Sequence, residues 1–227
     1  MQGALRELDN EEVALLGGHS NEGAELAFGL SVNGYAAPQQ LLLKSALRSG
    51  HALILTKAIG TGTLLAANQA AAAEGRWIDE ALANMLLSSR AALEILRAHG
   101  VAACTDVTGF GVLGHLLEML RASQIGAHLR PAAIPLLRGA RQCIERGYRS
   151  SLHHSNRVHL ESLTERFGQS PDTDLLLDPQ TAGGLLAAVP ADQAEKCVAA
   201  LQAAGYRDAA IIAACDPQIS AGRVALC

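Results

Sequence analysis

Aromatic side chains are scarce in this sequence, whose 227 residues include one tryptophan, three tyrosines and three phenylalanines. Alanine and leucine must fill the core instead, which suits helices packed closely on a sheet. The sequence also lacks an apolar run long enough to span a bilayer, and its N-terminus lacks the charged-then-apolar pattern of a signal peptide. We therefore expect no membrane partner.

An excess of positive charge is also lacking, because the net charge is -4. Broad binding to nucleic acid needs a basic surface, so we expect no nucleic-acid partner. The five cysteines are odd in number and form no Cys-x-x-Cys pair. This pattern favours free thiols in a reducing compartment over a disulfide framework, and a cytoplasmic location is expected.

Enough apolar sequence is present for a globular core, since 49% of the residues are hydrophobic and 18% are charged. Within the first part of the chain, residues 4–16 have helical spacing, and residues 24–34 alternate like a strand. A lone helix and strand form no core. We therefore interpret residues 1–37 as the remnant of another domain and residues 38–227 as an α/β domain.

The larger part is organised around residues 104–115, where a short strand ends in a Thr-Asp pair and a glycine turn leads into an amphipathic helix. The N–H groups at a helix N-terminus favour an anion, and Gly109 lets a ligand approach the backbone closely. An acid before such a turn would repel a phosphate, so Asp106 is best explained as a ligand of a bridging Mg²⁺. The alternative is that Asp106 or Thr108 only caps the helix.

Gly17, Gly18 and His19 allow two interpretations. They form either a glycine-rich turn from helix to strand or a backbone nest that offers N–H groups to a nucleotide phosphate.

Lys57 precedes Gly60-Thr61-Gly62-Thr63 in a weak echo of a phosphate-binding loop. The lysine comes before the glycines, unlike in a true phosphate loop. A strand-end lysine and a helix cap by Thr61 or Thr63 are therefore favoured.

Periodicity predicts the remaining elements. Strands are expected at residues 52–56, 127–129, 209–214 and 223–226, and helices at residues 41–47, 64–73, 78–99, 136–144 and 191–204. Two apolar runs within residues 174–186 favour a strand–turn–strand unit. His153, His154 and His159 are not expected to bind a metal, since no acid or cysteine lies at ligand spacing.

Several segments together resemble selenophosphate synthetase, also called selenide, water dikinase. They are Thr-Asp-Val-Thr-Gly-Phe-Gly at residues 105–111 followed by Leu-Gly-His, Gly-Gly-His-Ser at 17–20, Leu-Thr-Lys with Gly-Thr-Gly at 55–62, and Asp-Pro-Gln-Thr-Ala-Gly-Gly-Leu at 178–185. Ala58 replaces the family's proline and Ala182 its serine. The resemblance extends from Gly3 to Asp216.

The resemblance implies the C-terminal domain of the aminoimidazole ribonucleotide synthetase-like fold, a mixed sheet with helices packed on one face. Residues 1–37 would then be a helix and strand of the N-terminal ATP-binding and dimerisation domain. The implied reaction makes selenophosphate, AMP and phosphate from ATP, selenide and water. The implied ligands are a nucleotide at Gly17, Gly18, His19, Thr105, Thr108 and Gly109, and Mg²⁺ at Asp106.

In the family, the reactive cysteine or selenocysteine, a nearby lysine and most Mg²⁺-binding acids lie in a glycine-rich front segment that this sequence does not match. We therefore assign no catalytic residue, and we expect the chain alone to be inactive and the front segment to be a partner. Residues 24–34 are expected to pair with a second copy in a homodimer. Two alternatives are a non-catalytic assembly or regulatory module and another ATP-dependent enzyme of the superfamily.

Overall fold

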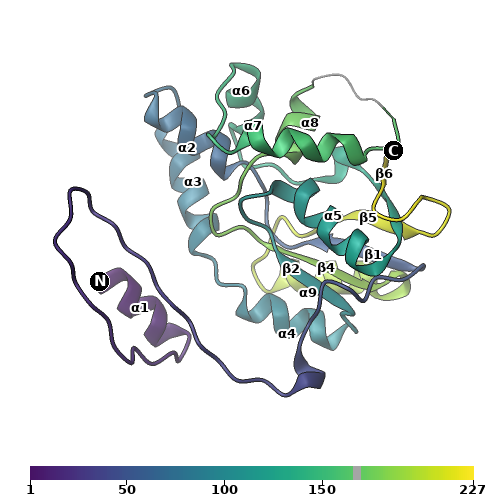
Figure 1. Ribbon diagram of the computed structural model, residues 1–227, viewed down its shortest axis with the longest axis horizontal. Helices are drawn as coiled ribbons and strands as arrows, with labels where there is room; N and C mark the ends of the chain where they lie inside the picture. The colour runs from purple at the N-terminus through teal and green to yellow at the C-terminus, as the bar shows by residue number, and fades with distance from the viewer. Residues whose placement is uncertain (166–169) are drawn as a thin grey trace. The chain divides into compact units, whose positions relative to one another are not determined.

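The computed structural model describes residues 1–165 and 170–227, which divide into two units, Met1–Leu41 and Leu42–Cys227 (Figure 1). The first unit contains helix α1 (Gln2–Asn10) and the 3-10 helix η1 (Pro38–Gln40). No residue of α1 is buried, and the helix ends well before residue 16. A short helix without a buried residue is marginal in water, which accounts for its early end.

The strand expected at residues 24–34 is not formed, and this prediction is wrong for the single chain. The segment is irregular, and its alternating apolar residues Leu26, Phe28, Leu30 and Val32 are exposed. A strand is stabilised by hydrogen bonds to a neighbouring strand, and no such ladder reaches these residues in the described part of the chain.

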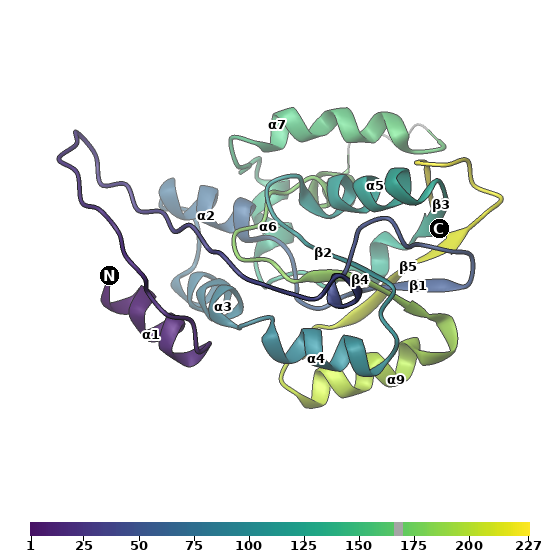
Figure 2. The ribbon, with the colours of Figure 1, turned by 60° about the horizontal axis from the view of Figure 1, so that its bottom comes forward.

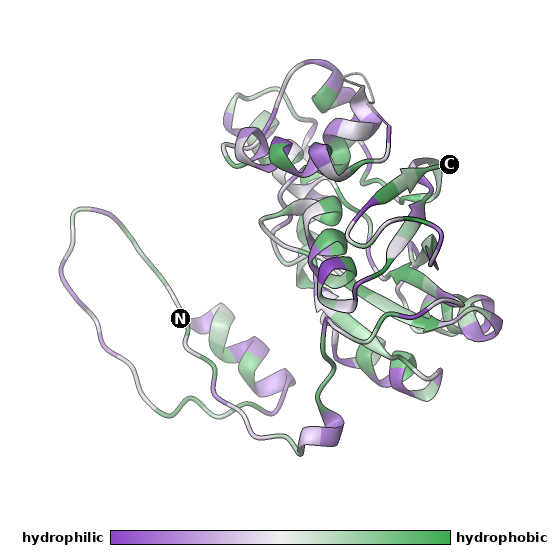
Figure 3. Cartoon of the chain, turned by 45° about the vertical axis from the view of Figure 1, so that its right-hand side comes forward, coloured by the Kyte–Doolittle hydropathy of each residue, from purple (hydrophilic) through white to green (hydrophobic). Residues whose placement is uncertain are grey.

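The second unit contains a six-stranded mixed sheet of order β2-β4-β1-β5-β3-β6. Its strands are β1 (His51–Leu55), β2 (Ala103–Asp106), β3 (Gly126–Leu129), β4 (Leu185–Pro190), β5 (Ala210–Asp216) and β6 (Val224–Leu226). β3 and β6 are parallel, and the other neighbours are antiparallel. The predicted mixed sheet is confirmed. The strands are coloured as mostly hydrophobic in Figure 3.

Helices cover both faces of this sheet, whereas one covered face was expected. α5 (Gly111–Ser123) packs on one face, and α4 (Arg90–Ala98) and α9 (Ala191–Ala203) pack on the other (Figure 2). β1 shows the cause, because Leu53 faces the α5 side while Ile54 faces the α4 and α9 side. Successive side chains on a strand point to opposite faces, so a strand that is apolar throughout needs cover on both.

A third cluster of buried residues lies at one end of the sheet. It is formed by α2 (Thr61–Gln69), α3 (Gly75–Leu86) and α6 (Ala140–Glu145) around Trp77. Gly139 has φ +84°, and a Cβ there would lie 2.2 Å from Cδ2 of the indole. Only glycine allows this close approach of backbone to Trp77. The remaining short elements are α7 (His153–Asn156), α8 (Pro171–Leu176), η2 (Pro131–Ala133) and η3 (Arg157–Ser162).

Two expected helices differ from the structure. Residues 78–99 form two helices, α3 and α4, separated at Leu87 to Ser89. Residues 41–47 are not helical, because their backbone groups bond elsewhere: the carbonyl of Leu43 accepts from the Cys104 N–H of β2, and that of Lys44 accepts from the Ser123 hydroxyl.

The first apolar run of residues 174–186 belongs to helix α8, so the expected strand–turn–strand unit is wrong. Ser170 caps α8 by accepting from the Thr173 N–H, and Pro171 occupies its first position. This start signal outweighs the strand-like apolar run that follows it.

None of the helices in residues 1–165 and 170–227 is long and apolar enough to cross a membrane.

The first prediction concerns the break between α3 and α4. The buried Tyr206 hydroxyl accepts from the Ala92 N–H at 2.9 Å and donates to the Ser88 carbonyl at 2.7 Å. Tyr206→Phe leaves both backbone groups unsatisfied and should lower the free energy of unfolding by ~1–3 kcal/mol in a urea titration. Tyr148→Phe is the matched control and should change it by less than ~0.5 kcal/mol. Equal effects of the two substitutions would contradict this role of the Tyr206 hydroxyl.

Candidate functional site

Three loops meet at one edge of the sheet. β1 and β2 both run antiparallel to β4, which lies between them, so the ends of β1 and β2 and the beginning of β4 share that edge. We call residues 56–63, 107–111 and 177–184 the three-loop junction. It brings together the three internal segments that carry the sequence motifs.

The buried side chain of Gln180 joins two of these loops. Its Oε1 accepts hydrogen bonds from the Gly60 N–H at 3.0 Å, the Thr61 N–H at 3.3 Å and the Thr61 hydroxyl at 3.1 Å. Its Nε2 donates to the main-chain carbonyl of Asp178 at 2.7 Å and to Asp178 Oδ2 at 3.0 Å. The carboxamide therefore uses both of its ends inside the junction.

Asp178 completes the cap of α2 from the same loop. Its fully buried carboxylate accepts from the Thr63 hydroxyl at 2.8 Å and from the N–H groups of Gly62 and Thr63. Burial raises the pKa of Asp178 to about 7, although these donors and Gln180 act to lower it. The first N–H groups of α2 are thus satisfied by Asp178 and Gln180, so the phosphate-loop echo at residues 57–63 does not form an open phosphate cradle.

Glycines let the three loops approach each other at van der Waals distance. A Cβ at Gly62 would lie 2.4 Å from the Pro179 carbonyl oxygen, and one at Gly183 would lie 2.2 Å from that of Val107. A Cβ at Gly184 would lie 2.7 Å from the main-chain nitrogen of Lys57. The Gly-Gly pair therefore fixes the position of both neighbouring loops.

The Thr-Asp pair lies at the end of β2. Thr105 is buried, whereas the Asp106 side chain is exposed at the junction. Helix α5 begins at Gly111 after Phe110 without a side-chain cap, so the capping alternative for Asp106 and Thr108 is not supported. Gly109 does not adopt a positive φ; the left-handed conformation belongs to Gly111, at φ +68°.

A chain of polar side chains runs from Thr108 through the buried His115 to the partly exposed pair of Glu118 and Lys44. Thr108 Oγ1 lies 3.2 Å from Nε2 of the buried His115, whose Nδ1 lies 3.0 Å from Glu118 Oε2. Lys44 Nζ donates to the same oxygen at 2.9 Å. Burial alone would raise the pKa of Glu118. The hydrogen bonds and charges of Lys44 and His115 lower it by more, so the pKa of Glu118 lies below its usual value. The network orients the Thr108 hydroxyl at the junction.

The other predicted nucleotide-binding residues lie in the first unit. Gly17, Gly18 and His19 are exposed in an irregular segment after α1. The structure therefore brings together Thr105, Asp106, Thr108 and Gly109, and it places Gly17, Gly18 and His19 in a separate unit.

The carboxylate at Asp106 suits Mg²⁺ as one ligand among several. Within residues 1–165 and 170–227, no three His, Cys, Asp or Glu side chains group as a metal site. Mg²⁺ is commonly held by one or two carboxylates, with water and phosphate oxygens supplying the remaining ligands. Asp106 fits that role because it is exposed, while Asp178 does not because it is buried and surrounded by donors.

Sequence interpretation missed the roles of Asp178 and Gln180. The feature that could have revealed these roles is the polar run Asp178-Pro179-Gln180-Thr181, shortly before two glycines, because it is more polar than a simple turn requires. Its partners in residues 60–63 could not be identified because they lie far away in the sequence.

Comparison with known proteins identifies the family of the chain. Residues 48–218 match the family described as AIR synthase related protein, C-terminal domain. The chain is similar to the selenide, water dikinase of Pelobacter propionicus (39% identical, covering 93% of the chain and 62% of the relative). It is also similar to that of Agathobacter rectalis (36% identical, covering 90% and 60%). The chain therefore spans about 60% of the length of these curated relatives.

Solved structures with the same fold include the hydrogenase maturation protein HypE of E. coli (TM-score 0.59, 20% identical, 82% of this chain and 48% of that one). Thiamine-monophosphate kinase from Stenotrophomonas maltophilia K279a is another (TM-score 0.55, 20% identical, 84% and 54%). The predicted fold class is confirmed.

The second prediction concerns Asp178. Its pKa of about 7 lies above the unfolded value of 3.8, so between these pH values the folded chain binds more protons than the unfolded chain. The free energy of unfolding should therefore fall as pH rises through this window, by at most ~4 kcal/mol from this group. Asp178→Asn should remove that slope in urea titrations at several pH values, whereas the exposed control Asp192→Asn should retain it. An unchanged slope in Asp178→Asn would disprove the shifted pKa.

Proposed function

The chain belongs to the AIR synthase related proteins, whose C-terminal domain it contains at residues 48–218, and on that basis we propose that it is part of a selenide, water dikinase. The identity to curated dikinases over about nine-tenths of the chain supports this assignment. The proposed reaction of the whole protein converts ATP, selenide and water into selenophosphate, AMP and phosphate. HypE and thiamine-monophosphate kinase share the fold at 20% identity, which favours the dikinase over other enzymes of the fold.

The observation that carries this proposal is the contrast between the exposed Asp106 carboxylate and the closed junction behind it. Phosphoryl transfer depends on positioning and on neutralising charge spread over several oxygens. A Mg²⁺ ion, when bound, would neutralise charge on the phosphates. Asp106 would supply one oxygen to that ion, and the backbone at Gly109 would approach the nucleotide.

Thr105 and Thr108 have different proposed parts in nucleotide binding. Thr108 presents a hydroxyl that His115 and Glu118 hold in place, so it can donate to or accept from a bound nucleotide. Thr105 is buried, and its hydroxyl donates to the Asp106 carbonyl at 3.2 Å. It therefore acts by fixing the backbone before the turn. Gly17, Gly18 and His19 would offer their N–H groups from the first unit.

The whole reaction is proposed to need groups beyond those identified in this chain. One exposed acid at the junction is too few to hold the metal ions that such a transfer uses. We therefore propose that the chain alone is inactive and acts with a segment equivalent to the part of its relatives that it does not match. The alternative, a non-catalytic module of the same fold, is an outcome of the experiment below.

We also propose that the protein is located in a reducing compartment, the cytoplasm. Its support is that Cys104, Cys143, Cys197 and Cys215 are buried free thiols, and Cys227 is an exposed one. Burial raises the pKa of Cys104 to about 12, which makes this thiol a poor nucleophile.

The third prediction tests the activity by phosphorus NMR with ATP, Mg²⁺ and selenide. The chain should form no selenophosphate alone, and should form it when joined to the segment of the Pelobacter propionicus relative that the match leaves uncovered. Asp106→Asn should then lower the rate by roughly 10²-fold or more, because a charge-neutralising contact is lost.

The matched control is Asp192→Asn, an exposed acid on α9, which should leave the rate unchanged. Selenophosphate from the chain alone would contradict the proposed need for further groups. No product from a joined protein that folds would favour the non-catalytic module.

The fourth prediction concerns self-association. Leu26, Phe28, Leu30 and Val32 alternate along an exposed segment, so they can form one apolar face once a second strand pairs with it. We propose that a second copy of the chain supplies this strand. Light scattering should show a dimer, and Phe28→Ser should shift it toward monomer, while Leu16→Ser outside the segment should not. A monomer at working concentration would refute the pairing.

A further inference from the structure

Lys57 is a buried cation for which the protein supplies little compensation. Lys57 is 3% exposed, and its Nζ donates one hydrogen bond, to the Ala182 carbonyl at 3.3 Å. No Asp or Glu oxygen of the described residues lies within 4.0 Å of it, whereas Lys44 has Glu118 at 2.9 Å. Burying a charge without a counter-ion is costly, so such a group indicates that its partner is a ligand.

The backbone beside Lys57 is fixed by Gly184 and Leu185, at the end of the 178–185 segment. Thr56 Oγ1 accepts from the Leu185 N–H at 2.8 Å, and the Thr56 N–H donates to the Leu185 carbonyl at 3.0 Å. Gly184 packs so closely that a Cβ there would lie 2.9 Å from the Lys57 Cβ. Gly184 and Thr56 therefore fix the backbone from which the lysine side chain leaves the sheet.

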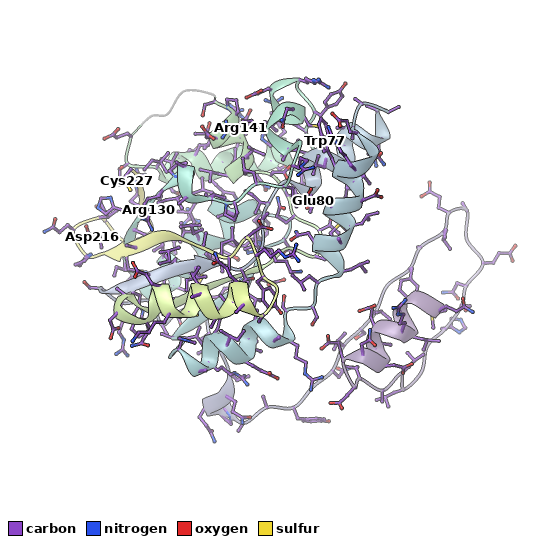
Figure 4. The ribbon with its side chains drawn as sticks, turned by 180° about the vertical axis from the view of Figure 1, so that it is seen from behind. Trp77, Glu80, Arg130, Arg141, Asp216 and Cys227 are labelled. Carbon is purple, nitrogen blue, oxygen red and sulfur yellow. The ribbon has the colours of Figure 1, made fainter. Side chains whose placement is uncertain are left out.

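Lys57 lines a cavity of about 570 Å³ between the end of α3 and the loop that joins α9 to β5. Glu80 on α3 (Figure 4), Arg207 and Asp208 also line it, but these three are exposed, and Glu80 has Arg138 at 3.7 Å. Of the four charged residues that line this cavity, Lys57 is buried and the other three are exposed. Asn84 adds an amide whose Nδ2 donates to the Ala58 carbonyl at 3.3 Å.

We propose that this cavity is an anion-binding site that takes a phosphate group, with the Lys57 ammonium as its counter-ion and Arg207 at its mouth. A tetrahedral oxyanion can accept from the ammonium and still leave oxygens for a guanidinium. The volume exceeds that of a lone phosphate, so the group can arrive free or attached to a small molecule such as a nucleotide. The site does not depend on the proposed dikinase activity.

Burial lowers the pKa of Lys57, and an anion in the cavity would raise it again. Phosphate binding should therefore be accompanied by uptake of a proton where the unliganded lysine is partly neutral. The carboxylates and cations that face the same cavity are Glu80, Asp208 and Arg207.

The fifth prediction tests the site by thermal unfolding and calorimetric titration of the full chain in phosphate-free buffer, with inorganic phosphate and AMP as probes and chloride matching the ionic strength. At least one of the two probes should raise Tm of the unchanged chain through specific binding. Lys57→Met should weaken binding roughly tenfold or more, Lys57→Arg should retain it, and Lys196→Met on α9 should leave it unchanged.

The stability of the variant separates a ligand-binding lysine from a structural one. Without any probe, Lys57→Met should unfold at the same or a higher temperature than the unchanged chain, because it removes an uncompensated buried charge. A response to phosphate supports free phosphate, and a response to AMP alone supports a carried phosphate group. The proposal is overturned if neither probe binds, if Lys57→Met binds as well as the unchanged chain, or if Lys57→Met is destabilised and Lys57→Arg fails to bind.

Discussion

The rest of the site depends on the hydrogen bonds of the Gln180 carboxamide. Its oxygen accepts from the Gly60 and Thr61 N–H groups, and its nitrogen holds Asp178 in place to receive those of Gly62 and Thr63. The beginning of a helix is therefore satisfied by a loop that precedes a different strand. The antiparallel arrangement of β2, β4 and β1 brings the loops together. This side chain then joins two of them, and the Gln180 N–H donates to the Thr108 carbonyl of the third at 3.0 Å.

The junction contains two acids in different surroundings. Asp178 is buried among donors and holds structure, whereas Asp106 is exposed at the end of β2. A transfer reaction that depends on positioning gains from such a division, because the groups that meet the ligand stay fixed while it binds. Lys57 adds a buried cation to the junction, and its main chain lies directly against Gly184.

Elements with a clear period were predictable from sequence, and those that depend on distant partners were not. The strands of the sheet and α9 have regular apolar spacing, and the structure confirms them, whereas the equally regular residues 24–34 form no strand in the single chain. The break at Ser88 depends on Tyr206, and the cap of α2 depends on Gln180, residues more than a hundred positions away. The Asp106 turn was located by its glycines and acid, but its role as a metal ligand remains a prediction.

The packing of Trp77 against Gly139 gives the chain an internal optical reporter. Trp77 is the sole tryptophan, and it is buried in the cluster of α2, α3 and α6 rather than between the sheet and its covering helices. Its fluorescence emission therefore monitors that cluster, while far-ultraviolet circular dichroism monitors the secondary structure of the whole chain. Coincidence of the two signals during denaturation would mean that the helical end and the sheet melt as one cooperative unit.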